Sequence, residues 1–118
     1  MRLSALVTVL FMLVFSSGAA QKGKEKEDPN IRSVQGAVYD ERDIPVEGAI
    51  VKLKNTKSLQ VRSFITQQDG TYYFHGLSTN VDYELKAEHQ GQSSQAKTLS
   101  IYDSRKKAII NLKLESNN

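Results

Sequence analysis

The chain has 118 residues, of which 16 are Lys or Arg and 13 are Asp or Glu, so its formal net charge at pH 7 is +3. This length allows one folded domain at most. Basic and acidic residues are interspersed along the chain, which argues against a nucleic-acid-binding surface. The sequence contains no cysteine. The domain must therefore be stable through packing alone, without the disulfides on which small secreted domains often rely.

The first 20 residues are typical of a cleavable secretory signal peptide. Arg2 precedes an apolar run over residues 3–15, and the small residues 16–20 follow it. The apolar run is shorter than the ~20 residues that a membrane-spanning helix needs. We expect cleavage after Ala20, and no lipid anchor because no cysteine follows. The mature protein is therefore expected to be secreted or periplasmic, without insertion into the membrane.

Residues 21–31 are expected to form a flexible charged arm. From Gln21 to Asn30 the chain is rich in Lys and Glu, has one Gly and one Pro, and lacks any hydrophobic residue. Such a segment cannot bury enough apolar surface to offset the entropy lost on ordering. A single folded domain is expected over residues 32–115, and residues 116–118 form a short tail.

Short strands recur through this domain, and no helical period is sustained. Over residues 82–88 apolar and charged side chains alternate, which is typical of a strand with one buried and one solvated face. The strand at 60–66 offers two apolar sets, and we favour Phe64 and Thr66 as its inward face. Two sheets facing each other across such side chains would form one core. We predict seven strands, at residues 34–39, 49–54, 60–66, 72–75, 83–88, 96–101 and 107–114.

Turn residues interrupt these strands at places where the backbone requires them. Pro45 fixes φ and removes a hydrogen-bond donor, so the chain must leave the sheet there. Asp69-Gly70 predicts a hairpin turn, and a corner is expected to start at Gly76. Behind the Asp69-Gly70 turn, alternate side chains of residues 72–74 should point into the core. The residues of this backbone and packing motif are Gly36, Pro45, Gly48, Asp69, Gly70, Tyr72, Phe74, Leu77 and Tyr83.

The order and spacing of these residues resemble the carboxypeptidase regulatory-like domain family, from Gly36 to about Leu114. The resemblance implies an all-β fold, a seven-stranded Greek-key β-sandwich with transthyretin-like (prealbumin-like) topology, found beside many unrelated catalytic and transport modules. One departure is visible. The family usually has a short Pro-Gly corner before the tyrosine, whereas this chain has the longer Ser78–Asp82 corner without Gly.

The residues present do not predict catalysis. His75 and His89 have no second His, Cys or motif-spaced carboxylate nearby, so we expect no metal site. Asp40, Asp43 and Asp69 are too scattered for a calcium loop and are interpreted as turn formers. Transthyretin-like hydrolases carry a C-terminal Tyr-Arg-Gly-Ser signature, whereas this chain ends Leu-Glu-Ser-Asn-Asn. We therefore predict no enzymatic activity and no cofactor.

Three non-catalytic roles remain open. The first is a protein-interaction or assembly module of the cell envelope, whose partner would be an unidentified envelope or secreted protein docked on sheet edges and loops. Charged side chains such as Lys52 and Lys54 would equally serve to protect those edges. The second role is carbohydrate binding to polysaccharide, with Tyr39, Tyr73 and Tyr102 as candidate surface contacts that present ring faces to a sugar.

The third role is a covalently cross-linked adhesin unit with a Lys–Asn isopeptide bond, as in related surface-protein repeats. It is disfavoured because the first strand has no lysine and Asn111 alternates outward. The basic cluster Arg105-Lys106-Lys107, close to Asp103, is interpreted as a solvated hairpin turn.

Overall fold

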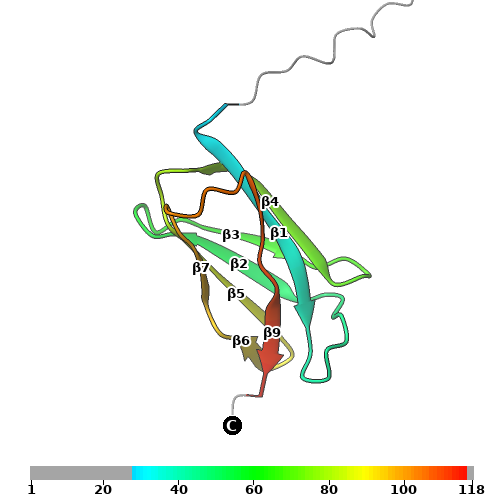
Figure 1. Cartoon of the computed structure of the whole chain (residues 1–118). Helices are drawn as coiled ribbons and strands as arrows, with labels where there is room; N and C mark the ends of the chain where they lie inside the picture. Colours follow the sequence, from blue (N-terminus) through cyan, green and yellow to red (C-terminus); the bar gives the residue numbers. More distant parts are fainter. Residues whose placement is uncertain (1–27, 117–118) are drawn as a thin grey trace, which may run out of the picture.

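The computed structural model describes residues 28–116, and over this range the chain forms nine strands and no helix (Figure 1). The predicted signal peptide, residues 21–27 of the predicted arm, and residues 117 and 118 lie outside the described residues. No helix in the described part is long and apolar enough to cross a membrane. The strands are β1 (Ile31–Tyr39), β2 (Ile50–Asn55), β3 (Val61–Ile65), β4 (Thr71–Ser78), β5 (Tyr83–His89), β6 (Gln92–Ser94), β7 (Lys97–Leu99), β8 (Lys107–Ile109) and β9 (Leu112–Glu115).

The strands form two layers that cross in Figure 1, with β1 and β4 in front of β2, β3 and β5. In one layer β3, β2 and β5 are neighbours, and β5 also pairs with β6 and β7. In the other layer β4 pairs with β1, and β8 and β9 run parallel to β1. The pairing of β6 with β9 joins the layers along one side. The predicted all-β sandwich is confirmed, with nine strands where seven were predicted.

Both differences in strand number have local causes. The short strand β6 is polar and follows a tight turn at Gln90 and Gly91, which both have positive φ. Its sequence therefore has no apolar alternation from which a strand could be predicted. The predicted last strand is divided into β8 and β9 where Ile110 passes over Gly36. A Cβ atom on Gly36 would collide with the carbonyl oxygen of Ile110. The close approach therefore requires glycine, whereas the register against β1 is the same for β8 and β9.

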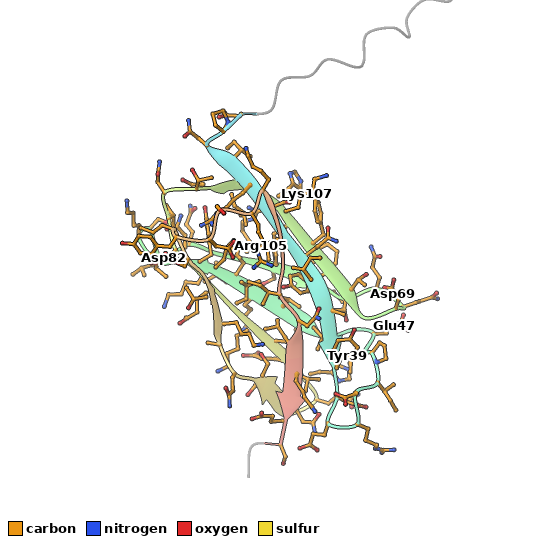
Figure 2. The ribbon with its side chains drawn as sticks, in the orientation of Figure 1. Tyr39, Glu47, Asp69, Asp82, Arg105 and Lys107 are labelled. Atoms are coloured by element: carbon orange, nitrogen blue, oxygen red, sulfur yellow. The ribbon has the colours of Figure 1, made fainter. Side chains whose placement is uncertain are left out.

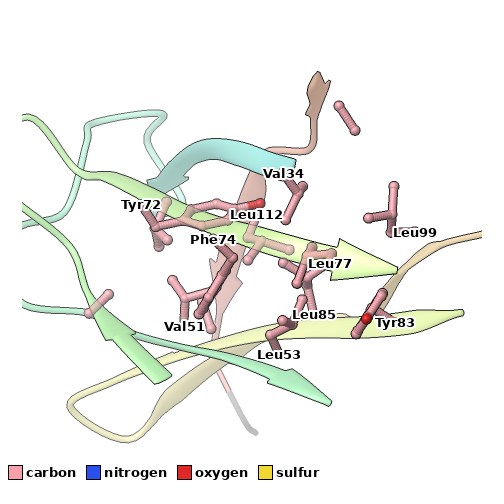
Figure 3. Packing of buried hydrophobic residues seen from close by; sticks show 14 of the residues in the cluster. Val34, Val51, Leu53, Tyr72, Phe74, Leu77, Tyr83, Leu85, Leu99 and Leu112 are labelled. Atoms are coloured by element: carbon pink, nitrogen blue, oxygen red, sulfur yellow. The ribbon is translucent and has the colours of Figure 1, made fainter. Parts of the chain in front are cut away.

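One hydrophobic core fills the space between the layers (Figure 3). As predicted, Phe64 on β3 and Thr66, the residue that follows β3, point inward, and Thr66 is almost fully buried. The ring of Phe64 meets the ring of Phe74 edge to face, with centroids 6.1 Å apart. Tyr72 is buried as predicted, and burial raises the pKa of its hydroxyl above the usual value. That hydroxyl therefore stays protonated and donates a hydrogen bond to the carbonyl of Ile110. The cluster consists of Val34, Val38, Ala49, Val51, Leu53, Tyr72, Phe74, Leu77, Tyr83, Leu85, Ala87, Leu99, Ala108, Leu112 and Leu114.

The turn at Asp69-Gly70 is present, but it does not make a hairpin. The Gly70 N–H donates to the carbonyl of Gln67, and Gly70 has a φ of +79°. The flanking strands β3 and β4 lie in different layers and are not paired with each other. The prediction of a hairpin was therefore wrong. Asp-Gly chemistry sets the local turn, whereas the choice of layer depends on where the apolar faces pack.

The segment from Asp40 to Gly48 leaves the sheet, as the proline predicted. Pro45 forms an isolated bridge with Tyr39, and the Val46 N–H returns to the carbonyl of Val38. Gly48 has a φ of +84°, the left-handed region that glycine adopts without a steric penalty.

The predicted corner at Gly76 is displaced along the chain. Gly76 lies inside β4, and the corner follows Ser78, the last residue of that strand. Here the phenol oxygen of Tyr83 accepts a hydrogen bond from the Ser78 N–H at 2.9 Å. The buried tyrosine therefore fixes the corner in place of the missing glycine.

The charged residues predicted to protect the sheet edges do not lie on an edge. Lys52 and Lys54 belong to β2, which lies between β3 and β5, and Lys52 forms an exposed ion pair with Glu88 at 3.2 Å. Among the described strands, β3 and β4 each pair along one side only and form the open side of the sandwich.

The basic cluster is also not a hairpin turn. The segment that contains Arg105 and Lys106 carries the chain from β7 in one layer to β8 in the other, and Lys107 is the first residue of β8. The sequence pattern correctly indicated that Arg105 and Lys107 are exposed to solvent, but it gave no information on this crossover.

Candidate functional site

The outer face of the sheet formed by β4, β1 and β8 carries side chains that the core does not use. Gln35 lies opposite Tyr73 on β4 and opposite Ile109 on β8, so these three residues form a row across the sheet. Ser33 lies opposite Lys107 and begins a second row. We call this surface, with Ile31 and His75 added, the outer face.

A β-bulge shapes the second row. Opposite Ser33, β4 contributes two residues, His75 and Gly76, and Gly76 has a φ of +71°. The extra residue lets Leu77 point into the core while His75 stays outside beside Tyr73. The Tyr73 and His75 rings are stacked, with centroids 5.6 Å apart and planes 22° from parallel. The bulge therefore supports an exposed, nearly flat aromatic surface.

Further apolar side chains are exposed on the same face of the sheet as this aromatic stack. The exposed fractions are 43% for Ile31, 45% for Tyr73 and 58% for Ile109. Ile31, Tyr73, His75 and Lys107 line a shallow depression of about 340 Å³, with Ser33 also in its lining. Together these side chains make this depression the candidate binding surface of the described residues.

Two lysines at the rim have different roles. The Lys106 ammonium donates to the carbonyl oxygens of Asp28 and Ile31, at 2.9 and 3.4 Å, and so holds the start of β1. The exposed Lys107 ammonium forms no hydrogen bond or ion pair within residues 28–116. Lys107 is therefore available to bind an acidic group.

A buried arginine supports the loops beneath this end of the sheet. Arg32 is 2% exposed, and its guanidinium donates to the carbonyl oxygens of Ser78, Val81, Ser100 and Asp103 at 2.8–3.2 Å. Sequence reasoning missed this residue. The available signal was its position two residues before the inward-facing Val34, which places Arg32 on the buried side of β1.

The loop held by Arg32 also contains an exposed ion pair. The Arg105 guanidinium donates to both carboxylate oxygens of Asp103, at 3.0 and 2.7 Å. The hydrogen bonds from the Arg105 side chain, followed by that from its backbone N–H, lower the pKa of Asp103 from 3.8 to about 2.

This ion pair predicts a small stability loss in acid. Because the pKa of Asp103 is lower in the folded protein, its carboxylate stabilises the fold above pH 4, and this contribution disappears as the pH falls toward 2. Asp103→Asn should lower the free energy of unfolding at pH 7 by about 0.5–1 kcal/mol. Urea titrations at pH 7 and pH 2 measure the effect. The difference in the free energy of unfolding between variant and wild type should nearly vanish at pH 2. An equal difference at both pH values would contradict the assignment of this stability to the ionised Asp103.

The three tyrosines named as candidate surface contacts do not form one site. Tyr73 lies on the outer face, whereas Tyr39 is half-buried at the far end of β1 from Lys107 (Figure 2). Tyr39 lines a separate depression together with Lys97 and Lys113. Tyr102 is 88% exposed, in a loop where the neighbouring Ile101 N–H donates to Asp82. Of the three tyrosines, only Tyr73 is stacked on another ring of the described residues, that of His75.

The acids considered for calcium form turns with their own backbone. The Asp40 carboxylate accepts the N–H groups of Ile44 and Arg42, which hold its pKa below the usual value. The Asp69 carboxylate accepts the Thr71 hydroxyl and N–H, with the same effect on its pKa. No group of three or more His, Cys, Asp or Glu residues with metal-binding geometry occurs among the described residues.

Asn111, the residue considered for an isopeptide bond, is exposed as predicted. Its side-chain oxygen accepts a hydrogen bond from the Ala37 N–H at 3.0 Å. The amide therefore secures the segment between β8 and β9 to β1.

Solved structures with this fold have little sequence similarity to the chain. The TIE protein of Bacillus anthracis superposes with a TM-score of 0.56 and 17% identity, over 74% of this chain and 17% of that protein. Catechol 1,2-dioxygenase from Acinetobacter gives a TM-score of 0.55 and 12% identity, over 80% of this chain and 55% of the enzyme. A candidate carbohydrate-binding protein of Pseudomonas aeruginosa gives 0.50 and 13%, over 74% and 90%.

The chain thus spans 17% and 55% of the lengths of the first two proteins. At these identities the likeness shows a shared fold alone. No curated protein matches the sequence. The model of the carboxypeptidase regulatory-like domain family, in contrast, matches residues 33–115, which include eight strands and most of β1. The chain belongs to the carboxypeptidase regulatory-like domain family.

Proposed function

We propose that this protein is a non-catalytic binding module, secreted or periplasmic, that docks an acidic segment of a protein partner on its outer face. The observation that carries the proposal is the exposed depression lined by Ile31, Tyr73, His75 and Lys107, with Ile109 exposed on the same face of the sheet. It supports a binding role because the surface is apolar at its centre and charged at its margin, as protein interfaces are.

The charge on Lys107 indicates what kind of partner segment would fit the outer face. The Lys107 ammonium is unpaired within the described residues, and a carboxylate placed near it would gain a favourable interaction at the partly dry edge of an interface. The rings of Tyr73 and His75 would bury an apolar side chain of the same segment. A short acidic stretch with one apolar residue therefore fits the surface.

Site-specific photo-cross-linking in the native host tests this proposal. A photoreactive amino acid replaces Tyr73 in the tagged full chain, and the control replaces Lys86, which is exposed on the outer side of β5 in the other layer. We expect one reproducible protein to be captured from Tyr73 and not from Lys86. Equal capture from both positions, or capture of polysaccharide from Tyr73, would overturn the proposal.

The captured partner then allows a charge test. Lys107→Glu should weaken its binding at least about tenfold at low salt, because the reversed charge repels the acidic segment. Lys97→Glu, which makes the same change on the exposed side of β7, should leave the affinity unchanged. Titration calorimetry measures both, and equal losses would assign the effect to net charge instead of the outer face.

Carbohydrate binding is the second candidate, favoured by the flat Tyr73–His75 stack. Stacked rings of this kind can hold the apolar face of a sugar. The Pseudomonas aeruginosa protein that shares this fold is itself a candidate carbohydrate-binding protein. If this candidate function holds, Tyr73→Ala should abolish retention on a polysaccharide column while lowering the free energy of unfolding by less than about 1 kcal/mol.

A further inference from the structure

The strand β3 is a sheet edge whose outward-facing side chains carry no charge. Natural edge strands carry outward charges, prolines or bulges that prevent pairing with another chain. The exposed side chains of Val61, Ser63 and Ile65 include no charged group, and Val61 and Ile65 are 53% and 65% exposed. Register shifts are absent from the pairing of β3 with β2. This described edge is therefore regular, and its outward-facing side chains are uncharged, with two of the three apolar.

The backbone of β3 offers free hydrogen-bonding groups on the same side. The Thr66 N–H donates to the Ala49 carbonyl, and the Asn55 N–H donates to the Gln60 carbonyl. Because antiparallel bonding alternates along a strand, the even-numbered residues of this segment bond to β2. The N–H and C=O groups of Val61, Ser63 and Ile65 therefore point away from the sheet.

The charged residue of β3 is directed elsewhere. The guanidinium of Arg62 lies over the ring of Phe74, at 5.5 Å from its centroid, and donates to the carbonyl of His75. Arg62 thus occupies an acceptor on the neighbouring edge strand β4. The same arginine protects one edge of the open side and leaves the other uncovered.

We propose that β3 pairs antiparallel with β3 of a second copy of this chain, about a twofold axis at Ser63. In this register Val61 lies opposite Ile65 of the second copy, and each facing pair exchanges both of its N–H···O bonds. On β2, Ile50 is paired with Ile65 and Lys54 is paired with Val61. Ile50 and the facing Ile65 and Val61 therefore form an apolar row across the seam, and no like charges face each other directly.

A second copy fits better than an unrelated strand because the edge is complementary to itself. Its two apolar positions are equally spaced from Ser63, so rotation about Ser63 brings each onto the other. The seam is short, and its area falls below that of stable dimers. We therefore expect a weak, concentration-dependent dimer with a dissociation constant in the high-micromolar range.

Sedimentation velocity over a wide concentration range tests the dimer. Ser63→Pro removes an N–H that points away from β2, so it should abolish dimerisation while preserving the β2 pairing. Ser63→Thr keeps the N–H and should dimerise as the wild type does. Thermal melting confirms that both variants are folded. A wild-type chain that stays monomeric, or a Ser63→Pro variant that still dimerises, would overturn the proposal.

A charge-exchange experiment tests the register. Ser63→Lys and Ser63→Glu each place like charges opposite each other at the axis, so each variant alone should be monomeric. An equal mixture should recover association at least to the wild-type level. Failure to recover would exclude Ser63 as the twofold position. Tyr73→Ala should not affect the dimer, which separates this proposal from the docking role of the outer face.

Discussion

Replacing Arg32 with methionine is expected to lower the free energy of unfolding by about 3–5 kcal/mol, a large part of the stability of a small domain. Methionine fills much of the same space but donates no hydrogen bond. The carbonyl oxygens of Ser78, Val81, Ser100 and Asp103 would lose their common donor in a buried setting. Urea unfolding of the protein, followed by circular dichroism, measures the change.

Two further variants separate the geometry of this contact from its charge. Arg32→Lys keeps the charge but lacks the planar fork that reaches both loops, so it should recover less than half of the loss. Lys97→Met removes an exposed cation and should change stability by less than about 0.5 kcal/mol. A loss below 1 kcal/mol for Arg32→Met would show that water replaces the guanidinium at little cost.

Replacing Phe74 with alanine is expected to lower the free energy of unfolding by about 3–5 kcal/mol. The ring is 3% exposed and contacts those of Phe64 and Tyr72, at centroid distances of 6.1 and 5.9 Å. Its removal would leave a cavity between the layers that the strands cannot close. The same urea titration measures the loss.

The adjacent residue supplies a matched control. Tyr73→Ala removes a ring of similar size from the outer face, where it is half-exposed, and should cost less than about 1 kcal/mol. Equal losses for the two variants would mean that the aromatic stack supports the fold as much as the core does.

Alternation along single strands was the most reliable signal in the sequence. It placed Phe64, Thr66, Tyr72 and Phe74 inward and Tyr73 outward, as observed. This works because the twofold period is a local property of the backbone. It fails where the backbone departs from that period, as at the bulge of Gly76.

Pairing between distant strands was not predictable in the same way. The outer face combines Tyr73 on β4 with Lys107 and Ile109 on β8, and only the shared neighbour β1 brings these residues together. Edge position likewise depends on the whole topology, which is why Lys52 and Lys54 were misplaced. Arg32 escaped notice because a charged residue is normally assigned to solvent.

The pairing of β1 with β8 and β9 also affects how fast the chain folds. The first strand of the domain pairs with β8 and β9, the last two, and both pairings are parallel. Contacts between the ends of a chain require a large loop to close before any bond forms, so domains of this topology fold in milliseconds to seconds. During synthesis this side of β1 stays unpaired until residues 107–115 have been added. Until then its unpaired side is open to other chains.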